Sequence, residues 1–523
     1  MRVGGDADGG SEGLAGRPIA YWLDSTPPTD YPPLRQELDV EVCVVGGGIA
    51  GLTTAYLLRQ AGARVAVVEA ERIVRRVTGH TTAKITSLHD LIYDQLIKRA
   101  GRGHAQRYAD AQQAAIERIA SLVDQLGIDC DFRRTDAYTY TESEQDLPSI
   151  HAEVDAARAL GLPASFTDQT PLPYPVRGAI TFTNQAEFHP RKYLLALAEA
   201  LVRAGGHIFE QTRAVGFHDA AEGRPCRIAT TGGDIRANDV VLATHVPVHD
   251  PALYFARLFP KRSYVLGCRL GGPAPRGVFI GTDPGHHSVR STPAGGGELV
   301  LIGGEGHKTG QGGDTRERVR ALECWARERF DVRSVDYRWA AQDPHTPDNV
   351  PFIGRLAPTS KHLWVATGFG GWGMTNATVA AMLLADLIVG RENPWAPAFD
   401  PGRFNTESVA PVVKENLNAA THLIGDRFRV AREERLADVA LAPGEGAVVR
   451  IGGQPVAVSR DAQGALSAVS AVCRHIGCYV AWNSAEQTWD CPCHGSRYAA
   501  DGTVLEGPAN ENLERLQQPD TAT

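Results

Sequence analysis

The sequence predicts an α/β body followed by a small all-β module. Three observations predict this arrangement. Between Val42 and Glu69, an apolar strand, a glycine-rich turn, a helix and a second strand follow one another, as in a nucleotide-binding βαβ unit. A second glycine-rich turn, at 367–373, again separates an apolar run from a helical stretch. From Val439 onward, short apolar runs alternate with Gly and Pro turns, the pattern of an all-β module.

The N-terminal unit carries residues suited to a dinucleotide. Val42–Val45 indicates a buried strand, the next six residues satisfy G-x-G-x-x-G, and Arg64–Val68 leads to Glu69. Such glycines let the backbone approach a pyrophosphate, the helix N-terminus attracts its charge, and the acid binds ribose hydroxyls, which disfavours NADP. A tight strand–helix turn without a ligand is the alternative. The predicted cofactor contacts are Gly46, Gly48, Ile49, Ala50, Gly51 and Glu69.

Two short loops near the C-terminus each supply one cysteine and one histidine. Cys473 and His475 lie in CRHIGC, and Cys491 and His494 lie in CPCHGS. Two thiolates on one iron and two imidazoles on the other describe a Rieske [2Fe–2S] centre, which is easier to reduce than an all-cysteine cluster. Structural zinc is the alternative, because zinc also accepts two Cys and two His. The cluster is favoured because a finger-type zinc site pairs Cys with Cys and His with His, whereas each loop here supplies one of each. Each loop also has a second cysteine, which a four-ligand zinc site would not need.

The segment from about Gly444 to Leu513 resembles the Rieske domains of respiratory and photosynthetic cytochrome complexes. The resemblance implies a disulfide between the two surplus cysteines and two hydroxyls that donate to cluster sulfurs, which raises the potential. It also implies a proline loop at 507–509 that shields the cluster. The residues concerned are Cys478 and Cys493 for the disulfide, and Ser496 and Tyr498 for the hydroxyls.

The second glycine-rich turn favours FAD over NAD. It follows the strand Leu363–Ala366 and precedes a helix from about Thr375 to Val389, so it offers a flavin backbone donors and a positive dipole end. Residues from about Asp39 to Gly390 resemble the D-amino-acid oxidase family of FAD-dependent oxidoreductases. The resemblance implies an FAD-binding Rossmann-like domain and a mixed-sheet substrate domain. It further implies FAD contacts at Thr81, Thr82, Ala83, Gly370, Gly371, Trp372, Gly373 and Met374.

Four stretches of the chain are expected to differ in structure. Residues 1–36 form an N-terminal tail, disordered to about Gly16, and a Pro-rich lead-in. Residues 37–392 form the oxidoreductase, in which FAD and substrate domains are discontinuous. Residues 393–425 form a linker whose stretch 414–424 is predicted to be a helix packed between domains. Residues 426–519 form the Rieske domain, a small β-sandwich.

Five residues are candidates for substrate chemistry. His80 stands near the position where some members of the family carry a flavin-linking histidine, so we expect either a covalent bond or a noncovalent ring contact. Lys84 either stabilises the reduced ring or is an ordinary surface lysine. Arg290 either binds a substrate carboxylate through its fork or forms a structural salt bridge. His307 and His345 are further candidates, although a lone loop histidine more often caps or packs.

Joining a two-electron carrier to a one-electron carrier predicts a dehydrogenase. A small amine or amino-acid-like substrate, a CH–NH or CH–NH2 donor, reduces FAD, and single electrons pass through the cluster to a redox protein or quinone. The predicted exit is an exposed edge near His475 or His494. Three alternatives stay open: electron flow from cluster to flavin, an NAD(P)H-dependent reductase without a visible second dinucleotide unit, and a non-catalytic redox protein.

Composition limits the other classes. The chain has 523 residues, 43% of them hydrophobic, and a net charge of −8, which suits two or three domains and offers no basic patch for nucleic acid. Apolar runs of transmembrane length and a secretory signal are both missing from the sequence, so we expect a cytoplasmic protein without a membrane span. Five scattered cysteines are expected to be buried thiols: Cys43, Cys130, Cys226, Cys268 and Cys324.

Overall fold

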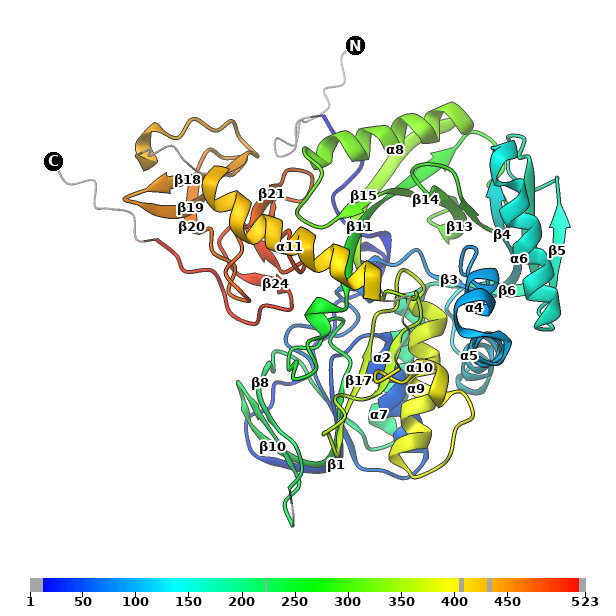
Figure 1. Cartoon of the computed structure of the whole chain (residues 1–523), viewed down its shortest axis with the longest axis horizontal. Helices are drawn as coiled ribbons and strands as arrows, with labels where there is room; N and C mark the ends of the chain where they lie inside the picture. Colours follow the sequence, from blue (N-terminus) through cyan, green and yellow to red (C-terminus); the bar gives the residue numbers. More distant parts are fainter. Residues whose placement is uncertain (1–12, 222, 404–408, 430–434, 517–523) are drawn as a thin grey trace.

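The structure is a computed structural model that describes residues 13–221, 223–403, 409–429 and 435–516 (Figure 1). The prediction of a disordered tail to about Gly16 falls mostly on residues 1–12, outside these ranges. For the described end of that tail the prediction is wrong. Arg338 donates a hydrogen bond to the Leu14 carbonyl at 3.2 Å, and Arg17 forms a β-bridge with Tyr337. These contacts hold the N-terminal segment on an edge strand of the body.

A largely parallel sheet forms the centre of the nucleotide-binding part of the body. Its main path runs β16-β17-β10-β1-β2-β7, and β16 is antiparallel to its neighbour in that path. Strands far apart in sequence pair here, because β10 and β17 extend the sheet on one side of β1. The bounds are Leu38–Val45 for β1, Val65–Val68 for β2, His207–Phe209 for β7, Gly233–Leu242 for β10, Phe352–Arg355 for β16 and Leu363–Thr367 for β17.

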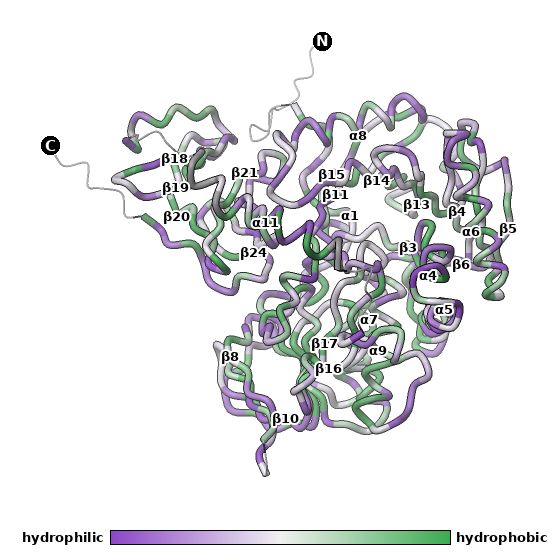
Figure 2. The backbone as a smooth tube through the Cα atoms, viewed as in Figure 1, coloured by the Kyte–Doolittle hydropathy of each residue, from purple (hydrophilic) through white to green (hydrophobic). Residues whose placement is uncertain are grey.

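Helices α2 (Ile49–Gln60) and α9 (Gly373–Ile388) lie together against this sheet. Their buried faces join one hydrophobic core with residues such as Leu58, Val379 and Leu383. Each such side chain contributes about 2 kcal/mol through removal of apolar surface from water. Figure 2 shows many hydrophobic residues along β16 and β17, whereas the outer helix α5 (Arg102–Leu126) carries many hydrophilic residues.

A second, mixed sheet forms the substrate part of the body, as predicted. Its order is β15-β11-β14-β13-β12-β4-β6-β3, with β5 beside β6, and the pair β12–β4 is parallel among antiparallel neighbours. The turn at 294–297 joins β13 to β14. The bounds are Lys84–Ile85 for β3, Arg133–Thr141 for β4, Ala164–Thr167 for β5, Gly178–Glu187 for β6, Phe259–Leu270 for β11, Val278–Gly281 for β12, Ser288–Ala294 for β13, Gly297–Lys308 for β14 and Val332–His345 for β15.

The C-terminal module contains two antiparallel sheets, also as predicted. One sheet has the order β18-β19-β20 and the other β21-β22-β23-β24. Trp489 and Tyr498, both fully buried, are partners in the ladder between β22 and β23 and belong to the hydrophobic core of the module. The bounds are Gly446–Ile451 for β18, Gln454–Arg460 for β19, Leu466–Ser470 for β20, Ala481–Asn483 for β21, Thr488–Asp490 for β22, Arg497–Ala499 for β23 and Val504–Glu506 for β24.

Helix α11 (Val409–Arg429) crosses between body and module and is longer than the predicted helix at 414–424 (Figure 1). On the body side, Lys308 Nζ lies 2.5 Å from Glu415 Oε2, and Asn416 donates to the Ala256 carbonyl at 2.8 Å. On the module side, Cys493 Sγ lies 3.5 Å from the Ala419 carbonyl oxygen. In the described ranges, no helix combines the length and the apolar character needed to cross a bilayer.

Candidate functional site

The glycine-rich turn between β1 and α2 has no room for a side chain at two of its glycines. Gly46 has a φ of +111°, and a Cβ at this position would collide with the Ala243 carbonyl oxygen. A Cβ at Gly51 would collide with the Gly46 carbonyl oxygen. The close approach leaves backbone amides and the α2 N-terminus facing a cavity, which is the cradle that a pyrophosphate requires. The turn therefore fits a dinucleotide.

Glu69 closes this turn from the end of β2. Its Oε2 accepts a hydrogen bond from Gly47 N at 2.8 Å, and its Oε1 accepts one from Glu71 N at 3.0 Å. Burial raises the pKa of Glu69 above its ordinary value. The carboxyl group lines the cavity at the place where an acid of this unit meets ribose hydroxyls.

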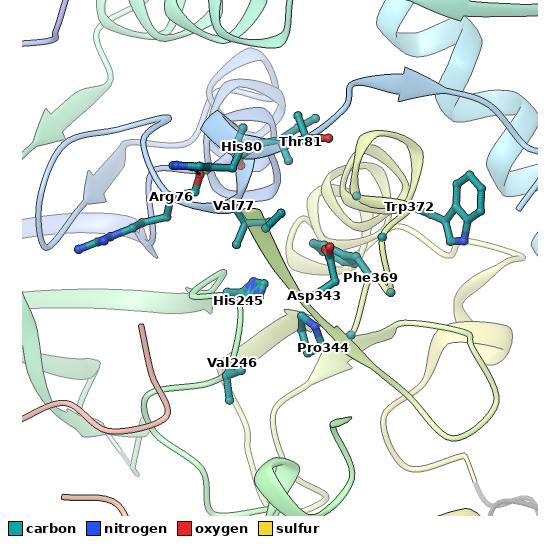
Figure 3. A pocket seen from close by; sticks show the side chains of 18 of the residues that line it. Arg76, Val77, His80, Thr81, His245, Val246, Asp343, Pro344, Phe369 and Trp372 are labelled. Carbon is teal, nitrogen blue, oxygen red and sulfur yellow. Dashed lines mark hydrogen bonds between the residues drawn. The ribbon is translucent and has the colours of Figure 1, made fainter. Parts of the chain in front are cut away.

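The cavity has a volume of about 690 Å³ and lies between the two parts of the body (Figure 3). Twelve of the predicted FAD contacts line it, and two do not. Gly51 acts through its packing on Gly46, and Ala83 is fully buried. The twelve lining residues are Gly46, Gly48, Ile49, Ala50, Glu69, Thr81, Thr82, Gly370, Gly371, Trp372, Gly373 and Met374.

The N-terminus of α9 borders the cavity at the same edge of the sheet as the glycine-rich turn after β1, because β1 and β17 both run parallel to β10. Trp372 lies at this end and stacks on His89, with ring centroids 4.6 Å apart and an interplanar angle of 20°. Gly370 has a φ of +57°, and a Cβ there would lie 3.2 Å from His345 Nδ1. This tight corner places backbone donors and the positive end of the helix at the cavity.

His80, Lys84 and His345 line the cavity, so three of the five predicted catalytic residues meet there. His80 Nδ1 lies 2.8 Å from the Arg76 carbonyl oxygen, which orients the ring. Burial lowers the pKa of His345 to about 3. Both imidazoles are therefore placed as neutral groups, since burial lowers the pKa of His80 as well.

Lys84 extends into the cavity from β3. Its Nζ donates hydrogen bonds to Thr82 Oγ1 at 2.8 Å and to Ser288 Oγ at 3.1 Å. Burial, and then the nearby Arg290 charge, lower the pKa of Lys84 to about 7. A lysine in this range exchanges its proton near neutral pH, unlike an ordinary surface lysine.

The structure contradicts the two remaining catalytic predictions. Arg290 is 1% exposed, lies outside the cavity, forms a 3.2 Å ion pair with Glu187 and donates to backbone carbonyls. Its guanidinium group thus has its partners within the protein, and Arg290 takes the alternative role, that of a structural salt bridge. His307 is engaged through both ring nitrogens, with Nε2 3.0 Å from the Tyr264 hydroxyl and Nδ1 2.8 Å from the Gln311 carbonyl oxygen. It is a packing residue.

Sequence reasoning missed several cavity residues, among them Asp343, His245 and Glu506. Burial raises the pKa of Asp343 to about 6. Asp343 lies two residues before His345 on β15, so strand alternation offered a signal for it. His245 follows β10 at a φ of +68°. Glu506 comes from the C-terminal module, and no local pattern could place it in this cavity. Figure 3 shows Asp343 and His245 extending toward the same space.

The four predicted cluster ligands converge between two loops of the module. The ring centroids of His475 and His494 lie 5.1 Å apart. Their Nδ1 atoms are buried and have no hydrogen-bond partner within the described ranges. Burial lowers the pKa of both rings, which favours the neutral, ligating imidazole. Cys491 hydrogen-bonds to Cys473 and lowers the pKa of that thiol to about 6. These donors fit a Rieske cluster.

The residues around the ligands agree with the same centre. Cys478 and Cys493 form the predicted disulfide between the two loops. Their sulfurs lie within 4.8 Å of Cys491 Sγ, but two disulfide sulfurs offer no thiolate, so this trio is not a metal site. The Tyr498 hydroxyl lies 3.2 Å from Cys473 Sγ. Ser496 Oγ accepts a hydrogen bond from Ala509 N at 3.0 Å, which leaves its own proton to donate.

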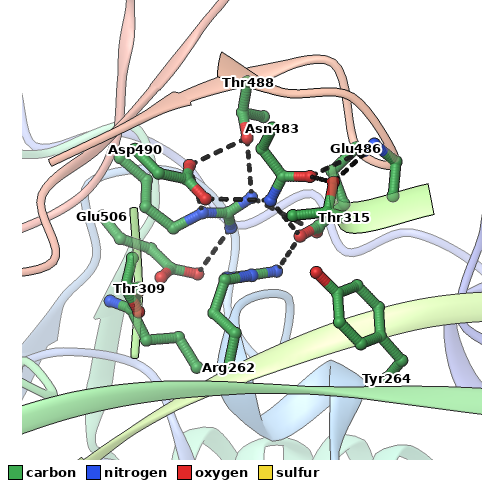
Figure 4. A network of polar contacts seen from close by, with 12 residues as sticks. Arg262, Tyr264, Thr309, Thr315, Asn483, Glu486, Thr488, Asp490 and Glu506 are labelled. Atoms are coloured by element: carbon green, nitrogen blue, oxygen red, sulfur yellow. Dashed lines mark hydrogen bonds and ion pairs between the residues drawn. The ribbon is translucent and has the colours of Figure 1, made fainter. Parts of the chain in front are cut away.

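The module is bound to the body through a buried charge network (Figure 4). Arg262 of β11 has a fully buried side chain and forms an ion pair with Glu486 of the module. Arg497 Nε lies 3.0 Å from Asp490 Oδ1, and its Nη1 lies 3.4 Å from Glu506 Oε1. Beside the network, Thr315 donates to Asn483 Oδ1 at 2.7 Å. The module therefore packs on the body through buried, specific contacts.

The histidine edge of the centre faces the body. Phe255 belongs to the 3-10 turn η2 (Tyr254–Ala256), and its ring centroid lies 5.0 Å from those of both His475 and His494. His494 is 7% exposed. The predicted exposed edge at His494 is therefore wrong, because the body covers it. His475 keeps partial exposure.

Two families match the chain in sequence. Residues 41–387 match the family described as FAD dependent oxidoreductase, and residues 430–517 match the Rieske [2Fe-2S] domain. Over 502 residues the chain is 39% identical to a protein of Bacillus subtilis (strain 168) named as Rieske 2Fe-2S iron-sulfur protein YhfW, covering 95% of this chain and 97% of that one. These matches confirm the two predicted cofactors, FAD and a Rieske cluster.

More distant similarities cover the body alone or the module alone. The body is 23% identical to gamma-glutamylputrescine oxidoreductase of Escherichia coli (strain K12), over 68% of this chain and 85% of that protein. A 46-residue stretch is 56% identical to the cytochrome b6-f complex iron-sulfur subunit of a Synechococcus strain, covering 9% of this chain and 27% of that one. The glycine oxidase structure from Geobacillus kaustophilus superposes with a TM-score of 0.60 at 18% identity, over 70% of this chain and 99% of that one.

Proposed function

Since the chain belongs to the FAD dependent oxidoreductase family and ends in a Rieske [2Fe-2S] domain, we propose that it dehydrogenates a small amine or amino acid and passes the electrons singly to an external acceptor. When bound, FAD takes a hydride equivalent from the carbon beside the substrate nitrogen, and the cluster carries one electron at a time. The relatives named gamma-glutamylputrescine oxidoreductase and glycine oxidase support this substrate class.

One observation carries the proposal: the flavin cavity is walled on one side by the module. Leu505, Glu506, Gly507 and Asn510 line the same cavity as Gly46 and the N-terminus of α9. The proline loop that follows β24 is therefore shared by cavity and cluster. Because electron exchange between two carriers weakens steeply with distance, a shared wall supports transfer within one chain.

The cavity's own side chains supply proton exchange. The pKa of Lys84 is lowered to about 7 and that of Asp343 is raised to about 6, in each case mainly by burial. Substrate ammonium must lose a proton before its C–H bond can be oxidised, and groups that titrate near neutral pH suit that transfer. We assign this role to Asp343, and to Lys84 the stabilisation of negative charge on the ring.

The test is anaerobic reduction by a panel of amines and amino acids, with NADH as the competing donor. We expect an amine to bleach the visible flavin bands, followed by the rhombic EPR signal of a reduced Rieske cluster at low temperature. Cys491→Ser is the matched control, since it removes a cluster ligand and leaves the cavity intact. In this variant the flavin should bleach without the EPR signal.

Other outcomes would contradict the proposal. Bleaching by NADH alone would favour the reductase, and a cluster that reduces while the flavin stays oxidised under every donor would reverse the order of transfer. Flavin that no amine and no nicotinamide reduces would leave a non-catalytic redox protein.

A further inference from the structure

Hydrogen bonds on both sides hold Phe255 in contact with the two cluster histidines. The turn η2 that carries Phe255 is held by Asp250, whose carboxylate accepts from Tyr254 N at 2.7 Å and from Phe255 N at 2.9 Å. The Tyr254 hydroxyl donates to the Leu356 carbonyl at 2.8 Å. Helix α11 closes the other side, where Asn416 donates to the Ala256 carbonyl at 2.8 Å.

The geometry of the contact is specific. Phe255 meets His475 at an interplanar angle of 80° and His494 at 85°, both edge-to-face arrangements at 5.0 Å. Such pairs are favourable beyond the area that they bury. One aromatic ring of the body therefore contacts both imidazoles at once and fills the space beside the metal centre.

The loop that carries His494 adjoins the flavin cavity, because Gln342 Nε2 donates to the Gly495 carbonyl at 2.9 Å and the next residue of β15, Asp343, lines the cavity. The proline loop reaches the cavity as well. Gly507 lines the cavity, and two residues later Ala509 N donates to Ser496 Oγ at 3.0 Å. The histidine loop and the proline loop therefore both adjoin the flavin cavity, and Phe255 of the body covers the two histidines.

We propose that the His494 side of the histidine edge is reserved for electron exchange with the flavin of the same chain, and that Phe255 is the positioning residue that holds and covers it. An external acceptor then exchanges electrons with the docked module without touching His494. The inference rests on the proposed function for the source of electrons but not for their direction. In each transfer one electron converts one ferric iron to ferrous iron, and a one-electron acceptor reoxidises the iron before the second electron follows.

The test supplies electrons without substrate, so that its result is independent of the amine. Flavin in the holoenzyme is photoreduced with EDTA as the sacrificial donor, and the appearance of the reduced-cluster signal is timed after the light pulse. For Phe255→Ala we expect transfer to slow about tenfold, the size of effect typical for residues that orient metal ligands. Reoxidation of the reduced cluster by ferricyanide should become faster, because the edge is open.

Two further variants separate positioning from general stability. Phe255→Leu keeps apolar bulk over the edge and should keep ferricyanide reoxidation slow. Ile476→Ser alters a 41% exposed side chain on the solvent side of the same loop and should leave both rates unchanged. The g-values of the reduced cluster should move in Phe255→Ala alone, since they depend on the packing of the imidazoles.

The results that would overturn the inference are distinct from failure of the proposed function. Phe255→Ala with unchanged transfer, ferricyanide and EPR behaviour would show that the histidine edge is not sealed by this ring. Slow transfer with ferricyanide access equal in wild type and Phe255→Ala would also overturn it. If no amine reduces the flavin but light-driven transfer responds to Phe255 as expected, the substrate proposal fails and this one stands.

Discussion

The Tyr498 hydroxyl, 3.2 Å from Cys473 Sγ, illustrates how single atoms tune this protein. A donor near a ligand sulfur stabilises the more negative, reduced cluster. The same logic applies in the cavity, where burial moves the pKa of Asp343 and of Lys84 toward neutrality from opposite sides. At the residue scale, chemistry depends on which polar atoms are buried together.

Tyr498→Phe should lower the reduction potential of the cluster. Loss of one hydrogen bond to a charged sulfur removes on the order of 1.5 kcal/mol of reduced-state stabilisation, which is about 60 mV for one electron. The measurement is an EPR-monitored redox titration. Tyr479→Phe, on the other side of the first cluster loop, is the control and should shift the potential far less. Equal potentials in Tyr498→Phe and wild type would contradict the assignment.

Asp343→Asn should change stability in a pH-dependent manner. The folded-state pKa of Asp343 is raised from 3.8 to about 6, so its stabilising contribution is complete below pH 3.8 and is lost as the pH rises through 6. At pH 7.5 the free energy of unfolding of the neutral variant should therefore be about 3 kcal/mol higher than that of wild type. Near pH 4 the two proteins should coincide. Denaturant unfolding at matched flavin and iron content measures this, and a pH-independent difference would refute the burial of the carboxyl group.

At the scale of elements, the strand–turn–helix units create the cofactor site. The turn after β1 brings the Gly46 carbonyl against Gly51, and the turn before α9 brings Gly370 against His345. Both helix N-termini then border one cavity at the same edge of the sheet, because β1 and β17 both run parallel to β10. Neither unit alone encloses a flavin, but each is complete as a local structure.

Gly51→Ala should abolish flavin binding while the chain still folds. The added Cβ would meet the Gly46 carbonyl oxygen, so the turn must open and its amides must leave the pyrophosphate position. Gly103→Ala in α5 is the matched control, because a Cβ there meets no atom within 4 Å. Flavin content of the purified variants, read from the visible spectrum, is the measurement. Full flavin content in Gly51→Ala would contradict this account of the turn.

At the scale of the whole molecule, the main feature is the close packing of the C-terminal module against the body. Gly310, at a φ of +70°, lies so close to the module that a Cβ would come 2.6 Å from Pro492 N. Arg262 brings a buried charge to the same interface and pairs with Glu486. A buried ion pair discriminates strongly against misplacement, since either charge alone is costly to bury.

Gly310→Ala should loosen the module without altering its fold. Gly313→Ala is the matched control, because Gly313 has a similar φ of +83° but no atom within 4 Å of an added Cβ. Backbone strain is therefore shared by the two variants, and the collision belongs to Gly310 alone. In calorimetry we expect wild type and Gly313→Ala to unfold in one transition and Gly310→Ala to separate into two. A single unchanged transition in Gly310→Ala would argue against tight docking.

The sequence by itself determined the parts of this protein whose chemistry is local. The cluster ligands and the turn at Gly46 could be predicted, because the spacing within each short motif is itself typical of the site. The Cys478–Cys493 pair was implied by the resemblance to Rieske domains. Strand β4 (Arg133–Thr141) is local in the same sense, since the alternation along it is a property of neighbouring residues.

Only the tertiary structure decided which distant groups face one another. The sequence left two roles open for Arg290, a substrate contact or a structural salt bridge, and its ion pair with Glu187 of β6 decides for the salt bridge. Glu506 enters the flavin cavity, and Phe255 covers both cluster histidines, because the module docks through Arg262. No spacing encodes such contacts, because they depend on how two separately folded surfaces fit and on which buried charges must pair when water is excluded.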